Sequence, residues 1–216
     1  MVREQSNELK SRNRVGGVII ISAPSGSGKS TVVQRLLSSV PNLEFSVSYT
    51  TRLPRPRERD GRDYYFVTSA RFREMVRGRE FLEWARVHGN FYGTSRRQIT
   101  EAQRAGSDIL LDIDVQGHRS VRRKLPGATS IFLLPPSLDE LRRRLAQRHA
   151  DTPEVIEKRV AAARREIRFW REYDYAVVND DLRCAVRSLR AVVEAARLRR
   201  ERQRDKILEI CRTFGG

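Results

Sequence analysis

The 216-residue sequence contains little cysteine and no long apolar run. Its two cysteines, Cys184 and Cys211, lie far apart and match no spacing typical of a metal or redox site. We therefore expect no disulfide framework and a reducing, cytoplasmic location. Apolar runs such as residues 18–21 are far shorter than the roughly 20 residues that cross a bilayer. Residues 1–14 lack the apolar stretch of a secretory signal, so the sequence predicts no membrane association and no export.

Lysine is also scarce, because all but five of the 43 basic residues are arginine. Only 27 acidic residues oppose them, which gives a net charge of +16 at pH 7. Such a charge is typical of proteins that bind polyanions, and arginine forms bidentate contacts with phosphate. No recognition module or ladder of stacking aromatic residues accompanies the charge. We interpret most of these arginines as solvated helix faces and do not expect nucleic acid as a partner. Weak binding to a polyanion stays open as an alternative, and its salt dependence would reveal it.

The order of the predicted elements indicates the fold class. Hydrophobic residues make up 39% of the chain, enough for a packed core. Apolar strands at 18–22, 109–114 and 130–134 alternate with amphipathic helices. This pattern predicts an α/β fold with a parallel sheet flanked by helices. Residues 45–51 alternate in the manner of a further strand.

Two stretches interrupt this alternation, a β-rich insertion at 47–94 and a helical insertion at 137–168. Both follow predicted core strands, on the side where open α/β sheets bind ligands. We predict a flexible tail at 1–14 and one domain over 15–216. The core of that domain is predicted to consist of three segments: 15–46, 95–136 and 169–216.

Residues 23–31 carry the most specific motif, between a β-branched strand and an amphipathic helix. The common phosphate-loop pattern is G-x-x-x-x-G-K-[ST]. Gly28, Lys29 and Ser30 match it, whereas Ala23 replaces the first glycine. This setting predicts a phosphate-binding P-loop rather than an ordinary turn before a helix.

The residue types in this loop fit phosphate chemistry. Gly26 and Gly28 let the backbone wrap closely around a phosphate, and the helix that begins near Lys29 adds its positive end. Lys29 would reach the β and γ phosphates of a nucleotide, and Ser30 would bind Mg²⁺.

The apolar strand predicted at 109–114 ends in two acids. Asp112 and Asp114 are two residues apart, which predicts that they share one face of that strand. In P-loop enzymes an acid at the end of a neighbouring strand helps to hold Mg²⁺. The alternative is a carboxylate that caps the helix beginning near Gln116, and for Asp114 the two interpretations stay open.

The β-rich insertion contains a proline-stiffened basic loop at 48–57 and an acid in an aromatic strand. Arg52 and Arg55 could clamp one phosphate, although a basic surface loop is equally compatible with the residues. Glu83 follows Phe81-Leu82 in the strand, where a buried carboxylate needs a partner. A guanine offers two adjacent donors, N1–H and the 2-amino group, whereas an edge strand would leave this carboxylate in solvent.

The helical insertion contributes the arginines Arg144, Arg148 and Arg159. Phosphoryl transfer needs positive charge around the migrating group, so their presence beside a P-loop favours a functional role. Each one alone would be compatible with a helix surface. The three histidines show no spacing typical of metal ligands.

Taken together, these motifs identify a resemblance to the guanylate kinases, which phosphorylate GMP with ATP. The resemblance extends from about residue 16 to about residue 204, and eight segments carry it in the order found in the family: 22–30, 47–55, 61–66, 83–84, 89–94, 111–117, 135–137 and 178–181. It implies a P-loop NTPase core with a GMP-binding subdomain at 47–94 and a helical lid at 137–168.

The resemblance also implies roles for individual residues. On the GMP side, guanine would be read by Ser48, Glu83 and Thr94. The phosphate would be clamped by Arg52, Arg55, Tyr64 and Tyr92. Asp112 would lie near GMP and Mg²⁺. On the ATP side it implies a binding loop and an adenine contact at Asn179; the loop residues are Ala23, Pro24, Ser25, Gly26, Ser27, Gly28, Lys29, Ser30 and Thr31. The implied catalytic residues are Lys29, Arg52, Arg144, Arg148 and Arg159. Glycines usually flank the second lid arginine in the family and are missing around Arg148, so its register is the least defined.

The sequence therefore predicts Mg²⁺-dependent transfer of a phosphoryl group from ATP to GMP or dGMP. One alternative is a non-catalytic guanylate-kinase-like scaffold, which typically loses the lysine present here as Lys29. Another is a P-loop kinase for a different small phosphate ester, which the guanine-reading set disfavours. The sequence leaves self-association open.

Overall fold

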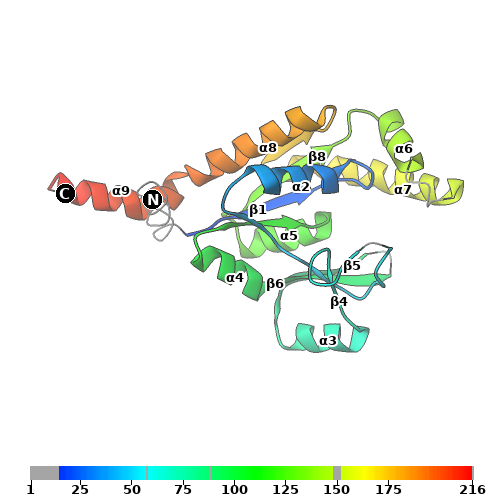
Figure 1. Ribbon diagram of the computed structural model, residues 1–216, viewed down its shortest axis with the longest axis horizontal. Helices are drawn as coiled ribbons and strands as arrows, with labels where there is room; N and C mark the ends of the chain where they lie inside the picture. The colour runs from blue at the N-terminus through cyan, green and yellow to red at the C-terminus, as the bar shows by residue number, and fades with distance from the viewer. Residues whose placement is uncertain (1–14, 57, 88, 148–151, 216) are drawn as a thin grey trace. The chain divides into compact units, whose positions relative to one another are not determined.

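The computed structural model describes residues 15–56, 58–87, 89–147 and 152–215. Within these described ranges the chain divides into two compact units: the first contains residues 15–18 and the part from 44 to 128, and the second contains residues 19–43 and the part from 129 to 215. Within the described ranges, no helix combines the length and the apolar character that a membrane span requires. Figure 1 labels the helices and strands.

The first unit contains a four-stranded sheet in the order β4 (Tyr65–Phe66), β3 (Tyr49–Thr50), β6 (Asn90–Ser95) and β5 (Phe81–Val87). Strand β6 runs antiparallel to both β3 and β5. Helix α3 (Ser69–Arg77) begins at the Thr68 cap and buries Phe72 and Met75 against Phe81 of β5. Aromatic packing thus fixes the sheet that carries the predicted base-reading residues.

The rest of the first unit contains β7 (Asp108–Asp112), which has β2 (Leu43–Phe45) as a neighbour in the sheet. In the chain, β7 follows α4 (Arg96–Arg104) and precedes α5 (Val115–Lys124). The single strand predicted for 45–51 is wrong, because the chain pairs in two places. The Ser46 amide donates to the Leu110 carbonyl at 2.9 Å. The Val47 amide and carbonyl bond instead to the Gln98 side chain, and this interrupts the strand.

The second unit contains three parallel strands in the order β1 (Val18–Ser22), β8 (Thr129–Leu134) and β9 (Tyr175–Val178). Ile19, Ile20 and Ile21 have no exposed surface, as expected of a strand buried on both faces. Helices α2 (Lys29–Ser39) and α8 (Leu182–Arg197) pack together, and each buries one apolar face. The predicted α/β class with a parallel sheet flanked by helices is confirmed.

Helices α6 (Leu138–Ala146) and α7 (Pro153–Glu166), followed by the 3-10 helix η1 (Ile167–Glu172), form the helical insertion. They share a small core of Leu141, Leu145, Val160 and Ala163. The α6–α7 pair is therefore stabilised by apolar contacts between its own two helices.

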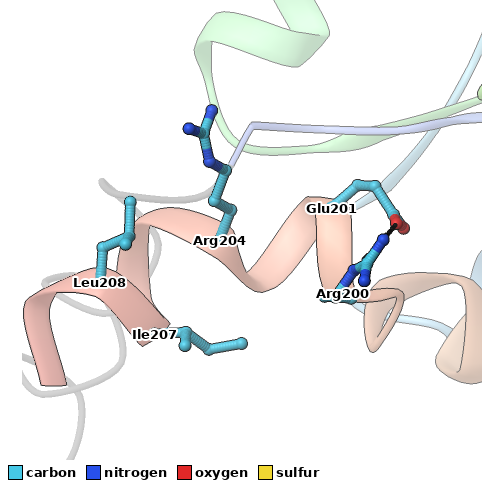
Figure 2. A pocket seen from close by; sticks show the side chains of 5 residues that line it. All are labelled: Arg200, Glu201, Arg204, Ile207 and Leu208. Carbon is cyan, nitrogen blue, oxygen red and sulfur yellow. Dashed lines mark hydrogen bonds and ion pairs between the residues drawn. The ribbon is translucent and has the colours of Figure 1, made fainter. Parts of the chain in front are cut away.

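The last helix, α9 (Arg200–Thr213), begins after the break at Leu198 and Arg199 and buries none of its side chains. Figure 2 shows Arg200 paired with Glu201 on this helix, with Arg204, Ile207 and Leu208 farther along it. These five side chains line a cavity of about 560 Å³. None of them belongs to the predicted site.

Candidate nucleotide site

The predicted P-loop joins β1 to α2, as the sequence indicated. Gly26 and Gly28 have φ angles of 93° and 83°, and Gly28 stands at the N-terminal cap of α2. Glycine is the residue that adopts such angles without strain. The Ser27 amide and hydroxyl both donate to the Pro24 carbonyl, at 3.2 and 2.6 Å, and close the turn.

The substitution of Ala23 for the first glycine of the common pattern has a simple structural account. Asn42 and Arg79 are the non-glycine residues with positive φ in the described part of the chain, so Ala23 adopts an ordinary backbone conformation. Alanine therefore causes no backbone strain there. Lys29, Ser30 and Thr31 form the first turn of α2, where the free amides of the helix end make a phosphate-binding position.

Helix α6 packs directly on this loop. A Cβ atom at Gly26 would lie 2.9 Å from Leu141 Cδ1 and from Leu145 Cγ. A Cβ atom at Gly28 would lie 2.6 Å from Asn179 Nδ2, which donates to the Ser27 carbonyl at 2.7 Å. A side chain at either position would therefore be strained by the positive φ and would displace the side chains that pack on the loop.

Two of the predicted lid arginines contact the loop. Arg144 donates from Nη1 to the Ser27 carbonyl at 3.2 Å and from Nη2 to the Asn179 carbonyl at 2.9 Å. Arg159 donates from Nε and Nη2 to Ser25 Oγ at 3.0 and 2.8 Å. Arg148 lies outside the described residues.

Glu140, which the sequence analysis missed, positions Arg144. Its Oε1 accepts from Arg144 Nε at 2.7 Å, and Arg143 donates to both of its oxygens. The hydrogen bonds from Arg143 and Arg144 lower the pKa of Glu140 to about 2. Its carboxylate therefore stays ionised at neutral pH and holds the Arg144 side chain. The i,i+4 spacing of the two residues was the available signal.

In the first unit, Glu83 and Thr94 face each other across β5 and β6. Thr94 Oγ1 donates to Glu83 Oε1 at 2.5 Å, and Glu83 is 5% exposed. A register shift between Phe81 and Glu83 allows three consecutive buried residues in β5, which regular alternation would not give. Burial raises the pKa of Glu83 to about 7, with the charge of Asp114 acting in the same direction.

Three of the four residues predicted to clamp the phosphate lie close together in the first unit. The Arg52 guanidinium lies 5.4 Å from the centre of the Tyr64 ring, and the rings of Tyr64 and Tyr92 are 5.9 Å apart. Burial, together with the charge of Asp112, raises the pKa of Tyr64 to about 12, so this hydroxyl keeps its proton. Arg55 is exposed.

Glu58, a second residue that sequence reasoning missed, organises this clamp. Its Oε1 accepts from Arg52 Nη2 at 2.9 Å, and its Oε2 accepts from the Arg55 amide at 2.7 Å. A single carboxylate thus fixes both the Arg52 side chain and the turn that carries Arg55. Ser48 lies half-buried in the chain between β2 and β3, where its carbonyl accepts from the Tyr65 amide at 2.9 Å.

The two acids after 109–111 take different places, so the prediction that they share a strand face is wrong. Asp112 ends β7, and Asp114 caps α5, with Oδ1 accepting from the Gly117 amide at 2.8 Å. A capping side chain and a helix turn replace the strand after Asp112.

The oxygen donors available fit Mg²⁺ bound through phosphates. Ser30 offers a hydroxyl at the exposed first turn of α2, and Asp112 offers a half-buried carboxylate. Among the residues described, no three His, Cys, Asp or Glu side chains gather into a metal-binding group. Mg²⁺ typically takes one or two protein oxygens together with waters and substrate phosphates, and each of these two side chains taken by itself offers such an oxygen.

The raised pKa of Glu83 predicts a pH-dependent stability. The ordinary value is 4.5 and the folded value is about 7, so the native protein binds the extra proton between these values. This residue therefore makes the free energy of unfolding fall as pH rises from about 4.5 to about 7, by at most about 3 kcal/mol, with no further change above. Urea unfolding at pH 5 and pH 8 measures the effect. Glu83→Gln should lose this part of the pH dependence; an unchanged pH dependence would exclude it.

The fold and site define a P-loop phosphotransferase, with a glycine-rich loop contacted by arginines from a helical insertion. The family model described as guanylate kinase matches residues 16–196, and the chain belongs to that family. It is 51% identical over 183 residues to guanylate kinase from Dechloromonas aromatica (strain RCB), covering 85% of this chain and 91% of the relative. It is 51% identical over 194 residues to that of Aromatoleum aromaticum (strain DSM 19018 / LMG 30748 / EbN1), covering 90% and 95%.

A solved structure agrees. The crystal structure of guanylate kinase from Anaplasma phagocytophilum is 34% identical, with a TM-score of 0.74, and the match covers 89% of this chain and 92% of that one. Guanylate kinases phosphorylate GMP with ATP, so the predicted enzyme class is confirmed at the level of the family.

Proposed function

We propose that this chain transfers the γ-phosphoryl group of ATP directly to GMP or dGMP, in the cytoplasm, as a step of purine nucleotide metabolism. The observation that carries the proposal is the buried Glu83 carboxylate, hydrogen-bonded to Thr94 at 2.5 Å. A carboxylate at such a position needs donors, and the N1–H and 2-amino groups of guanine supply two side by side. Adenine has an acceptor at N1 and no 2-amino group, so it would offer this carboxylate neither of the two donors.

The acceptor nucleotide binds to the first unit in this proposal. Glu83, Thr94 and Ser48 read the base. Arg52 and Arg55, fixed by Glu58, hold the GMP phosphate, and Tyr64 and Tyr92 donate to it from their hydroxyls. The arrangement of Arg52 over the Tyr64 ring and the protonated state of that tyrosine support these roles. Asp112 lies near this group, as its influence on the Tyr64 pKa indicates.

ATP binds to the second unit. The P-loop amides and Lys29 hold its phosphates, and Asn179 lies near the adenine. Arg144 and Arg159, and Arg148 by resemblance, neutralise charge on the migrating group. Support comes from the contacts of Arg144 and Arg159 with Ser27 and Ser25, the loop residues that would lie next to a bound phosphate.

Ser30 and Asp112 are the residues we propose for Mg²⁺. The chemistry that Mg²⁺ supplies when bound is charge neutralisation on the β and γ phosphates. An oxygen of the GMP phosphate attacks the γ-phosphorus, the bond to the β,γ-bridging oxygen breaks, and ADP leaves with the electron pair. No strong base is needed because the attacking oxygen is already anionic, so positioning and electrostatics supply the rate.

The non-catalytic scaffold alternative is disfavoured because Lys29 is present and Gly26 and Gly28 keep P-loop angles. Self-association stays open.

Direct transfer predicts inversion at phosphorus. The enzyme is incubated with GMP and ATP whose γ-phosphoryl group is made chiral with oxygen isotopes, and the configuration of the new β-phosphoryl group of GDP is determined. We expect inversion, since one in-line displacement inverts the centre. Net retention would indicate a phosphorylated enzyme intermediate and contradict the mechanism, and absence of labelled GDP would contradict the activity.

A further inference from the structure

The second oxygen of the Glu83 carboxylate lies against the first turn of α5, at a residue without a side chain. Gly117 is the third residue of α5 and is buried. A Cβ atom built on it would lie 3.1 Å from Glu83 Oε2. Thr94 fixes Oε1 of Glu83 by a hydrogen bond. The position of Oε2 is therefore available only because residue 117 has no side chain.

The other atoms around Gly117 have little freedom to move. The same Cβ atom would lie 3.1 Å from Ile113 Cβ and 3.4 Å from Asp114 Oδ1. Ile113 is 7% exposed and its Cβ is fixed to the backbone. Asp114 accepts from the Gly117 amide at 2.8 Å and its carbonyl accepts from the His118 amide at 2.9 Å. Of the three neighbours, Glu83 is the flexible end of a side chain and is the one that would shift.

Helix α5 is also tied to β5 at its other end. Lys124, in the last turn of α5, donates from Nζ to the Leu82 carbonyl, next to Glu83 in the chain. The helix and the strand pack against each other. Tilting α5 away from β5 to admit a methyl group at residue 117 would break this contact.

We infer that Gly117 is a specificity-determining positioning residue, which sets the Glu83 carboxylate at the place where both of its oxygens can accept from guanine. The inference rests on the proposed reading of guanine by Glu83. It assigns Gly117 no contact with the substrate.

Gly117→Ala tests this inference. Alanine favours a helix interior over glycine, so a merely structural role predicts equal or higher stability and unchanged kinetics. We expect instead that KM for GMP rises about tenfold or more and that the preference for GMP over IMP, which lacks the 2-amino group, falls by a similar factor. KM for ATP and the turnover number at saturating GMP should change less than twofold. Unchanged KM for GMP and an unchanged GMP/IMP ratio would overturn the inference.

Gly127→Ala is the matched control, because Gly127 is exposed and a Cβ there would meet nothing within 4 Å. It should behave as the wild type. Glu83→Gln, measured beside them, distinguishes the role of Gly117 from the reading of guanine by Glu83. If Glu83→Gln leaves the GMP/IMP ratio unchanged, the proposed reading of guanine fails and the inference with it. If Glu83→Gln alters the ratio and Gly117→Ala does not, only the inference fails.

The double variant Gly117→Ala/Glu83→Asp keeps the inference testable if Gly117→Ala does not fold. Aspartate is one methylene shorter and withdraws the carboxylate from residue 117. Recovery of a cooperative thermal transition in the double variant would support a clash with Glu83. An unfolded double variant would locate the clash at Ile113 and overturn the inference.

Discussion

Arg144→Ala is expected to lower the turnover number by a factor of about 10³ to 10⁵, the range found when a phosphotransferase loses an arginine that stabilises the migrating group. Arg144 bridges the Ser27 carbonyl of the P-loop and the Asn179 carbonyl, and Glu140 holds its Nε. Its charge is thus anchored beside the loop before any substrate binds. Steady-state kinetics at saturating ATP and GMP measure the loss.

Arg143→Ala is the control for this prediction. Arg143 shares the Glu140 carboxylate with Arg144 and lies on the same helix, but its side chain is 58% exposed and its described bonds go to Glu140. It should retain the turnover number within a few-fold. Equal losses in the two variants would mean that general charge on α6, and not the placement of Arg144, supports the reaction.

Glu83→Ala is expected to lower kcat/KM for GMP by about 10³. The carboxylate would accept two hydrogen bonds from guanine, each contributing about 1.5–3 kcal/mol when one partner is charged. The same variant should be at least as stable as the wild type at pH 8, because burial raises the pKa of Glu83 to about 7 and the ionised form is costly to bury. Initial rates with varied GMP and a urea titration measure the two effects.

Glu101→Ala provides the comparison, since Glu101 is an exposed carboxylate on α4 in an exposed ion pair with Arg97. This substitution should change neither kcat/KM for GMP nor the free energy of unfolding. A Glu83→Ala variant that lost stability together with activity would indicate a structural role for this residue and contradict the assignment.

The fold class and the P-loop could be predicted because their signals are local. A β-branched strand, two glycines, a lysine and a helix with one apolar face specify phosphate binding within residues 18–40, and the structure has β1 and α2 there.

The parts that could not be predicted depend on partners distant in the chain. Nothing near residues 45–51 indicates that Gln98 replaces a strand partner at Val47. The spacing of Asp112 and Asp114 fits a strand, and the capping bond from the Gly117 amide decides otherwise. The importance of Gly117 itself follows from Glu83, which precedes it by more than thirty residues and reaches it only through the packing of α5 on β5.

A coupled assay of ADP release, with Mg·ATP and GMP, dGMP, AMP, CMP, UMP or no acceptor, measures whether the enzyme phosphorylates guanine nucleotides selectively. We expect fast turnover with GMP, slower turnover with dGMP, and rates with the other acceptors no higher than without an acceptor. Comparable turnover with AMP would contradict guanine reading by Glu83. If a folded protein that binds ATP releases no ADP with any acceptor, the proposed kinase activity is contradicted and the non-catalytic guanylate-kinase-like scaffold is favoured.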